Sequence, residues 1–147
     1  MHDSNQPAPK DGLAVQFMEF DGEVYDKESI TMETLDKMIR FIMTAREASI
    51  FLSLDEYGEG EDSFVTTDVE NGWAAVAFNG WNEDGTPYMY QPVSQEGGVE
   101  EAPVCIGGQT PVAMRNALHD IALAANCLHY FALTGERYPW VEWEQTA

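Results

Sequence analysis

The chain has 147 residues, which suits one domain and leaves little room for two. Its hydrophobic fraction of 44% supplies enough apolar side chains for a core and excludes a disordered chain. With 26 acidic residues against 7 Lys and Arg, the formal net charge is −19. A conventional binder of nucleic acid or of an anionic membrane is therefore not expected, because both surfaces are negative; the expected partners are basic proteins or cations.

The first twelve residues are polar and contain two prolines, so we predict a flexible tail over 1–12. They include no apolar stretch typical of a secretion signal, and no run long enough to cross a membrane occurs, so we expect a cytoplasmic protein. Cys105 and Cys127 lie far apart in the sequence with no paired motif. This spacing predicts neither a disulfide framework nor a thiolate metal site.

In the first half of the chain, loose alternation over 13–20 predicts a strand that a turn at Asp21 and Gly22 ends. Thr31 is the expected N-cap of a helix that continues to about Arg46, because its apolar residues recur three and four positions apart. Alternation predicts a second strand over 49–54, followed by an acidic loop over 55–63. Residues 72–78 and 88–93 predict two strands joined by a tight turn at 82–85.

In the second half, residues 94–103 carry two glycines and a proline and are expected to be mobile, and 104–106 predicts a short strand. Thr110 as cap and Pro111 at the first helical position predict a long helix that reaches Leu133 and ends at Gly135. Alternation over 138–144 predicts a terminal strand. Together these elements predict one α+β domain over 13–147, a mainly antiparallel sheet packed by two main helices in a single layer.

Acidic residues are concentrated in the middle of the chain, where residues 47–101 hold 13 Asp and Glu and no Lys or Arg. They form three groups beside Gly or Pro, which indicates loops. The groups are Asp55, Glu56, Glu59, Glu61 and Asp62; Glu83 and Asp84; and Glu96, Glu100 and Glu101. Such loops either keep the protein soluble, as in proteins adapted to high salt, or form a negative surface that attracts a basic partner.

Reaction chemistry has little support in the sequence. His119 and His129 lie ten positions apart on the predicted last helix and lack the spacing of four that chelation favours, so we expect each ring to be hydrogen-bonded at the helix edge. Neither Cys nor Ser lies in a catalytic motif, and the glycine pairs match no phosphate-binding loop. We therefore predict no enzyme activity, no metal and no cofactor.

The last forty residues carry a recognisable pattern. A helix ending in Phe131 is followed by Thr134, Gly135, Glu136 and Arg137, and then by Pro139, Trp143 and Glu144. This segment resembles the closing motif of the first-numbered immunity-protein family of bacterial polymorphic toxin systems, although Tyr138 here separates the Arg from the Pro that usually follows it. Gly72 and Trp73 at the start of an apolar strand, with Tyr88 and Tyr90 in the returning strand, resemble the middle hairpin of that family.

The resemblance implies a non-catalytic antidote that binds the toxic domain of a secreted protein, often a nucleic-acid-acting enzyme such as a deaminase. A domain of this kind needs a basic substrate groove, which anionic loops can cover. We expect the contact residues in the acidic loops, with two aromatic anchors: Asp55, Glu56, Tyr57, Glu59, Glu61, Asp62, Trp81, Glu83 and Asp84. For Trp81 a place in the core is an equal alternative.

The residues that carry the resemblance are expected to be structural rather than contacting: Gly72, Trp73, Gly135, Arg137, Pro139, Trp143 and Glu144. Gly135 would stop the helix, Arg137 would bind terminal carbonyls or a carboxylate such as Glu144, and Trp143 would supply apolar area to the core. Two alternatives for the function stay open. One is an enzyme with an unrecognised carboxylate site in a pocket, and the other is a general acidic mimic of nucleic acid or an adaptor without a dedicated toxin.

Overall fold

The computed structural model describes residues 13–94 and 97–147. The flexible tail predicted over 1–12 and the acidic residue Glu96 lie outside the described residues.

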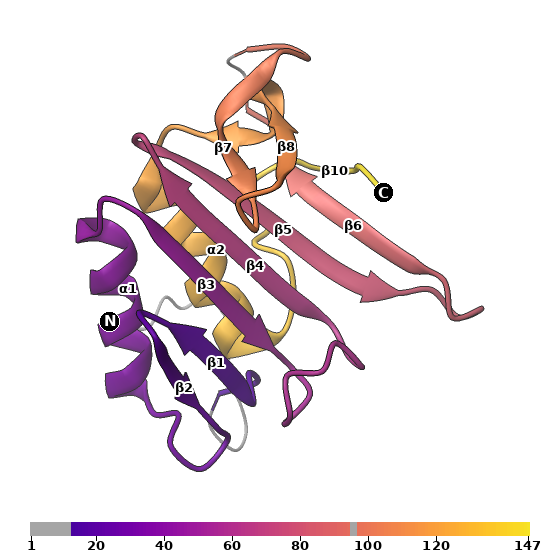
Figure 1. The fold of residues 1–147 in the computed structure, drawn as a ribbon. Coiled ribbons are helices and arrows are strands. Elements are labelled where there is room, and N and C mark those ends of the chain that lie inside the picture. The colour runs from indigo at the N-terminus through magenta and orange to yellow at the C-terminus, as the bar shows by residue number, and fades with distance from the viewer. Residues whose placement is uncertain (1–12, 95–96) are drawn as a thin grey trace.

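An antiparallel sheet of eight strands forms the centre of the described part (Figure 1), which confirms the predicted α+β class. The strand order is β10-β6-β5-β4-β3-β1-β2, and β9 pairs with β5 off this path. The bounds are β1 Phe17–Phe20, β2 Glu23–Tyr25, β3 Ala48–Ser53, β4 Phe64–Glu70, β5 Trp73–Trp81, β6 Pro87–Pro92, β9 Ala117–Leu118 and β10 Trp143–Gln145.

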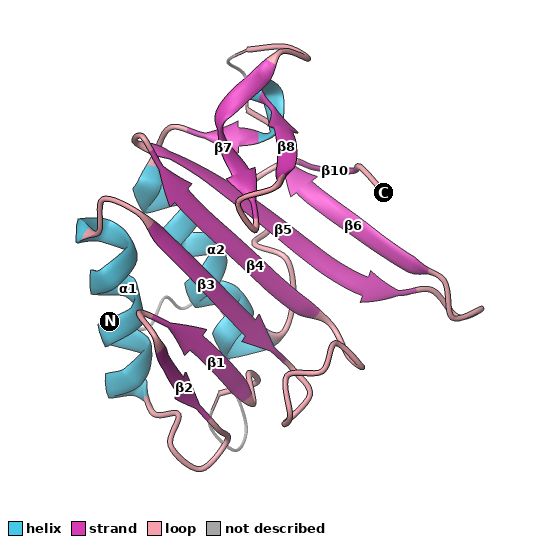
Figure 2. Cartoon of the chain, in the orientation of Figure 1, coloured by secondary structure: helices cyan, strands magenta, loops and turns pink. Residues whose placement is uncertain are grey.

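Two helices, α1 (Met32–Thr44) and α2 (Ile121–Thr134), pack against one face of this sheet (Figure 2). The Thr31 hydroxyl accepts a hydrogen bond from the Thr34 backbone N–H at 3.2 Å, so the predicted N-cap of α1 is confirmed. The apolar face of α1 is buried, whereas α2 is apolar on most sides because it contacts α1 on one side and strands β4, β5 and β9 on others. The single layer of helices is as predicted.

Strand β5 separates two clusters of buried side chains. Ala74, Val76 and Phe78 belong to the large core beneath the helices, as the alternation predicts. Ala75 points to the opposite face, where it packs against a second small sheet made of β7 (Glu101–Ile106) and β8 (Thr110–Ala113). The molecule therefore has three layers in this region, with the β7–β8 hairpin on the face that the helices leave open (Figure 1).

The long helix predicted from Thr110 to Leu133 is wrong in its first half. Residues 110–118 form β8, a short 3-10 turn and β9, and α2 begins only at Ile121 with Asp120 as its N-cap. The reason is the pair Gly107 and Gly108, whose φ angles of 62° and 76° reverse the chain so that β8 pairs with β7. Pro111 is tolerated there because β8 is bonded on one side only.

Other differences concern the strands. The strand predicted over 13–20 comprises only 17–20, and the terminal strand predicted over 138–144 comprises only 143–145. Strands β2 and β4 were not predicted, although the alternating β-branched residues of β4 are typical of a strand. The segment expected to be mobile over 94–103 already contains the beginning of β7, which starts at Glu101.

Candidate functional site

The first acidic group lies in the loop that joins β3 to β4. Its two ends are held together because the Leu54 N–H donates to the Ser63 carbonyl at 3.0 Å. Asp55 organises the interior: its carboxylate accepts from the Ser53 hydroxyl at 2.5 Å and from the Glu59 N–H at 3.0 Å. Burial raises the pKa of the Asp55 carboxyl, but these hydrogen bonds outweigh it and hold the pKa below its ordinary value. The loop is therefore built around a carboxylate that is ionised near neutral pH.

The second acidic group lies in the turn between β5 and β6. The Asn82 N–H donates to the Thr86 carbonyl at 2.8 Å, and Gly85 has the positive φ of 86° that the predicted tight turn requires. Asp84 accepts from the N–H and the hydroxyl of Thr86, and these bonds lower the pKa of its carboxyl. Glu83 is exposed beside it.

Trp81 joins the two groups. Its indole Nε1–H donates to the carbonyl of Gly60 at 2.9 Å, across 21 positions of sequence. The side chain is 45% exposed, so the alternative of a core position for Trp81 is wrong. We call the resulting surface the acidic end. It contains all nine predicted contact residues: Asp55, Glu56, Tyr57, Glu59, Glu61, Asp62, Trp81, Glu83 and Asp84.

This hydrogen bond leads to a first prediction. Trp81→Phe keeps an aromatic ring but removes the indole donor, so we expect a loss of about 1 kcal/mol in the free energy of unfolding. Amide hydrogen exchange should become faster at Gly58 to Glu61, because their loop loses its tie to β5. A variant with unchanged exchange in this loop would contradict the proposed tie.

Charge at the acidic end is not uniform. Lys27, in the segment that leads from β2 to α1, makes a salt bridge of 2.5 Å with Glu56. The Lys27 ammonium holds the pKa of Glu56 below its usual range, so Glu56 is ionised but paired. Tyr57 beside it is 71% exposed and is the more available aromatic side chain. Sequence reasoning missed Lys27, because its partner lies 29 positions further along the chain.

The third acidic group is separate from the other two. Glu100 and Glu101 lie where the chain enters β7, at the top of the molecule in Figure 1, whereas the two loops of the acidic end lie at its lower right. The Glu100 carboxylate accepts from the N–H of Gly98 at 3.2 Å. The described part of the chain therefore brings two of the three predicted groups into one surface.

Most residues of the family-like motif have structural positions. Gly135 caps α2 with a φ of 77°, and its N–H donates to the Phe131 carbonyl, as predicted. The Trp143 indole donates to the Tyr138 carbonyl at 2.9 Å, and the ring packs half-buried against the main core. Trp73 stacks on His119 at 4.2 Å between ring centroids. His119 thus lies before α2 and not on it, contrary to the prediction. Gly72 and Pro139 are exposed.

The expected pairing of Arg137 with Glu144 or with terminal carbonyls is wrong. Glu144 is bound by Arg115 at 2.9 Å and by the Asn116 side-chain amide at 2.8 Å. Arg137 instead lies over two aromatic rings, with Cζ 3.9 Å from the ring centroid of Tyr90 and 5.7 Å from that of Phe78. Arg115 and Asn116 belong to the segment 110–118, for which the sequence predicted a helix. The wrong partner predicted for Glu144 therefore follows from the wrong structure predicted for that segment.

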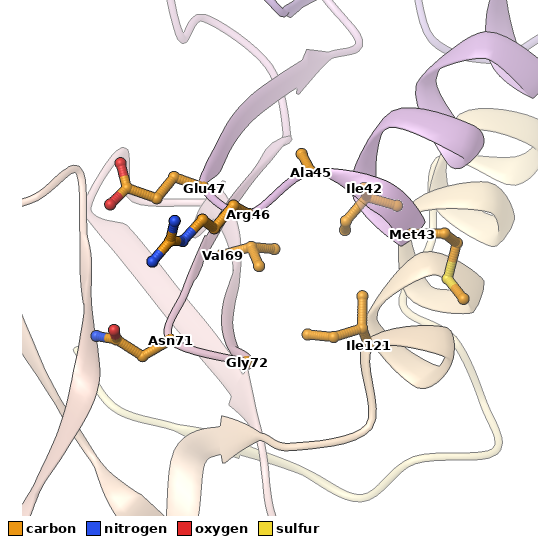
Figure 3. A pocket seen from close by; sticks show the side chains of 9 residues that line it. All are labelled: Ile42, Met43, Ala45, Arg46, Glu47, Val69, Asn71, Gly72 and Ile121. Carbon is orange, nitrogen blue, oxygen red and sulfur yellow. The ribbon is translucent and has the colours of Figure 1, made fainter.

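A hollow of about 680 Å³ lies between the end of α1, the β4–β5 turn and the start of α2 (Figure 3). Ile42, Val69 and Ile121 give it an aliphatic floor, and Arg46 and Asn71 lie on its polar side. Its nine lining residues include no Ser, Thr, Cys, His or Lys, and Glu47 is the one carboxylate among them.

Asp68 is the one described carboxyl group whose pKa is raised. Burial raises this pKa, and hydrogen bonds from the Gly107 N–H and from Ser49 oppose the rise only in part. The bond from Gly107, at 3.0 Å, ties the turn of the β7–β8 hairpin to β4. Asp68 lines a hollow of about 370 Å³ together with Cys105, yet its carboxylate is engaged in holding the hairpin.

A second prediction follows from the raised pKa of Asp68. Ionised Asp68 costs the folded state stability, so wild-type stability falls as pH rises above the ordinary carboxyl pKa, and Asp68→Asn escapes this loss. We expect the variant to gain on the order of 0.5 kcal/mol over wild type, a small value because Asp68 is only part-buried and solvent screens its charge. The gain should develop between the ordinary carboxyl pKa and the raised pKa of Asp68 and stay constant above it. Asp84→Asn, where the pKa is lowered, should show the opposite trend. Thermal unfolding at a series of pH values measures the stability of both variants relative to wild type. If the two stability differences changed with pH in the same direction, the raised pKa of Asp68 would be contradicted.

Other sources of chemistry are limited in the described residues. Burial raises the pKa of the Cys127 thiol to about 12, so this thiol is not a nucleophile near neutral pH. Within 13–94 and 97–147, no group of three His, Cys, Asp or Glu residues is arranged to hold a metal ion. Neither of the two helices in these ranges is both long and apolar enough to cross a membrane.

Comparisons with known proteins add no identification. No known protein family matches the chain, and no curated protein matches it. The likeness to immunity proteins therefore stays a prediction that depends on the motif residues alone.

Proposed function

We propose that this protein binds and neutralises a cognate secreted toxin, a nucleic-acid-acting enzyme of the deaminase type, inside the cytoplasm of the cell that produces it. The acidic end would cover the basic groove of the toxin, with carboxylates in the positions that substrate phosphates occupy. The observation that carries the proposal is the tie between Trp81 and Gly60, which unites seven acidic residues from two loops on one surface.

Long-range electrostatic attraction would speed the encounter between this protein and its partner. A partner with a basic groove would be attracted by the net charge of −19 and oriented by the seven acidic residues that the two loops bring together. Such steering raises association rates by roughly 10- to 1000-fold over an unsteered encounter. An antidote gains directly from a fast encounter, because the toxin must be captured before it modifies nucleic acid.

Two exposed aromatic side chains support an interaction surface over a purely solubilising one. Tyr57 and Trp81 lie among the carboxylates and are 71% and 45% exposed. Aromatic residues surrounded by a charged rim are where binding energy concentrates in protein interfaces. A surface that served only solubility in high salt would have no use for exposed rings among its carboxylates.

The proposal is tested with the toxin domain encoded next to the gene for this protein. The purified protein should capture that domain from solution and abolish its activity on nucleic acid when added in equal amount. A toxin domain that stays fully active in excess protein would reject the proposal. Equal binding to many unrelated basic proteins would favour the general acidic mimic.

A further inference from the structure

Arg137 has an unusual position for a cation in so acidic a chain. Its side chain is exposed, and Cζ lies 3.9 Å from the ring centroid of Tyr90. Among the described residues, the salt bridges are those of Lys27 with Glu56 and of Arg115 with Glu144, so Arg137 takes part in none. A guanidinium that stacks through its flat face keeps the N–H donors at its edge for another partner.

The surroundings of Arg137 form a groove of about 640 Å³. Its wall is positioned by specific contacts: the Trp143 indole is fixed to the Tyr138 carbonyl, and Tyr88 lies directly over Gly80, where a side chain would collide with it. Arg137 itself is held by its contacts with the rings of Tyr90 and Phe78, which are cross-strand neighbours on β6 and β5. A positive group fixed in this way binds an anion at a lower entropic cost than a freely moving side chain.

The groove adjoins the acidic end. Ser63 closes the loop between β3 and β4 through its carbonyl, and the same residue lines the groove. Lys27, the cation of the acidic end, is already neutralised by Glu56. Arg137 therefore adds one unpaired positive charge at the border of a surface that is otherwise negative.

We propose that Arg137 receives a carboxylate of the bound toxin domain, an Asp or Glu side chain at its basic cleft. This inference rests on the proposed function. Basic clefts that process nucleic acids hold catalytic carboxylates among their cations, and a surface that offered only negative charge would repel them. An arginine matches a carboxylate with two parallel N–H···O bonds, which fixes orientation as well as charge.

Glu136 provides a second test, because it lines the same groove and has the same negative charge as the carboxylate of the toxin domain. It makes no salt bridge with Arg137 among the described residues. Removing its charge by Glu136→Gln should therefore strengthen the binding of a carboxylate, whereas Arg137→Gln should weaken it. A purely structural role of this segment would not produce opposite signs at adjacent positions.

With the toxin domain as partner, we expect Arg137→Gln to weaken binding by about tenfold or more, mainly through faster dissociation. Arg137→Lys should restore only part of the loss, since it keeps the charge but loses the paired donors. Arg46→Gln is the matched control, because Arg46 is also exposed and makes no salt bridge among the described residues. If the wild-type protein neutralises the toxin domain and Arg137→Gln binds that domain as tightly as wild type, the inference is wrong and the proposed function still holds.

The free protein allows a test that needs no toxin. The probe is the blocked peptide acetyl-Glu-Glu-Glu-amide, added to ¹⁵N-labelled protein in salt that screens the general repulsion. We expect a saturable shift of the Arg137 Nε–H and of the Trp143 indole N–H, lost in Arg137→Gln and tighter in Glu136→Gln. An Arg137 signal that moves no more than that of Arg46, or one that responds to inorganic phosphate and not to the peptide, would overturn the carboxylate site.

Discussion

The combined variant Glu59→Gln, Glu61→Gln and Asp62→Asn will associate with the toxin domain about tenfold more slowly at low ionic strength, with a weaker dependence on salt. The reason is the removal of three exposed charges from the acidic end. The fold should stay intact, because the Asp62 carboxylate accepts only from the neighbouring Ser63 N–H, and an Asn oxygen accepts equally well. Stopped-flow association rates across a salt series measure the effect.

A matched control is available elsewhere on the surface. Glu47, Glu100 and Glu101 are exposed and lie outside the acidic end, so their replacement by Gln removes the same charge from another place. If steering depends on the position of the charge, this control changes the rate far less than the acidic-end variant. Equal rates for the two triple variants would show that net charge alone drives association, and would contradict a specific surface.

The largest effect on stability is expected at the centre of the core. Phe131 on α2 is 1% exposed and meets Phe78 of β5 edge to face at 5.6 Å between centroids. Phe131→Ala should lower the free energy of unfolding by about 3–5 kcal/mol, because it loses the buried ring and leaves a cavity between the helix and the sheet. Urea unfolding measures this loss.

Phe131→Leu serves as the control for the same site. It keeps most of the apolar volume and should cost much less than the change to Ala. A loss below about 1 kcal/mol for Phe131→Ala would mean that α2 does not pack on β5 as described.

Several elements were predictable because their signals are local. The helix α1 follows from the Thr31 cap and from apolar residues such as Leu35 and Met38 at helical spacing, all confirmed. Strand β5 follows from the alternation of Ala74, Val76 and Phe78, which do share the core face. In each case the decisive residues lie within a few positions of one another.

The prediction for residues 110–120 failed because two signals compete there. Thr110 and Pro111 are typical of a helix start, but the pairing of β8 with β7 satisfies the backbone and buries Val112 beneath the hairpin. Tertiary pairing thus overrides a local helix signal. The true start of α2 had its own signal, since Asp120 is a good N-cap and its carboxylate accepts from the Leu123 N–H.

The composition of the acidic end was predictable, but its assembly was not. The residues of both loops stand out in the sequence as acids beside glycine, and the turn at Asp84 and Gly85 is local. Their union depends on strand pairing between β3, β4, β5 and β6 and on the bond from Trp81 to Gly60, which no short-range pattern reveals. The same holds for Arg137, whose stacking on Tyr90 requires the segment after α2 to cross β6.

The central claim is that the acidic end occupies the substrate groove of a toxin. The most direct measurement is a titration of the toxin domain's activity on nucleic acid with this protein, at fixed toxin and varied substrate. We predict that the activity of the toxin domain falls linearly and is lost at one equivalent of this protein. The inhibition should be competitive with the nucleic-acid substrate, and it should be weaker for the triple acidic-end variant. Undiminished activity in excess protein, or inhibition equally strong with that variant, would contradict the account.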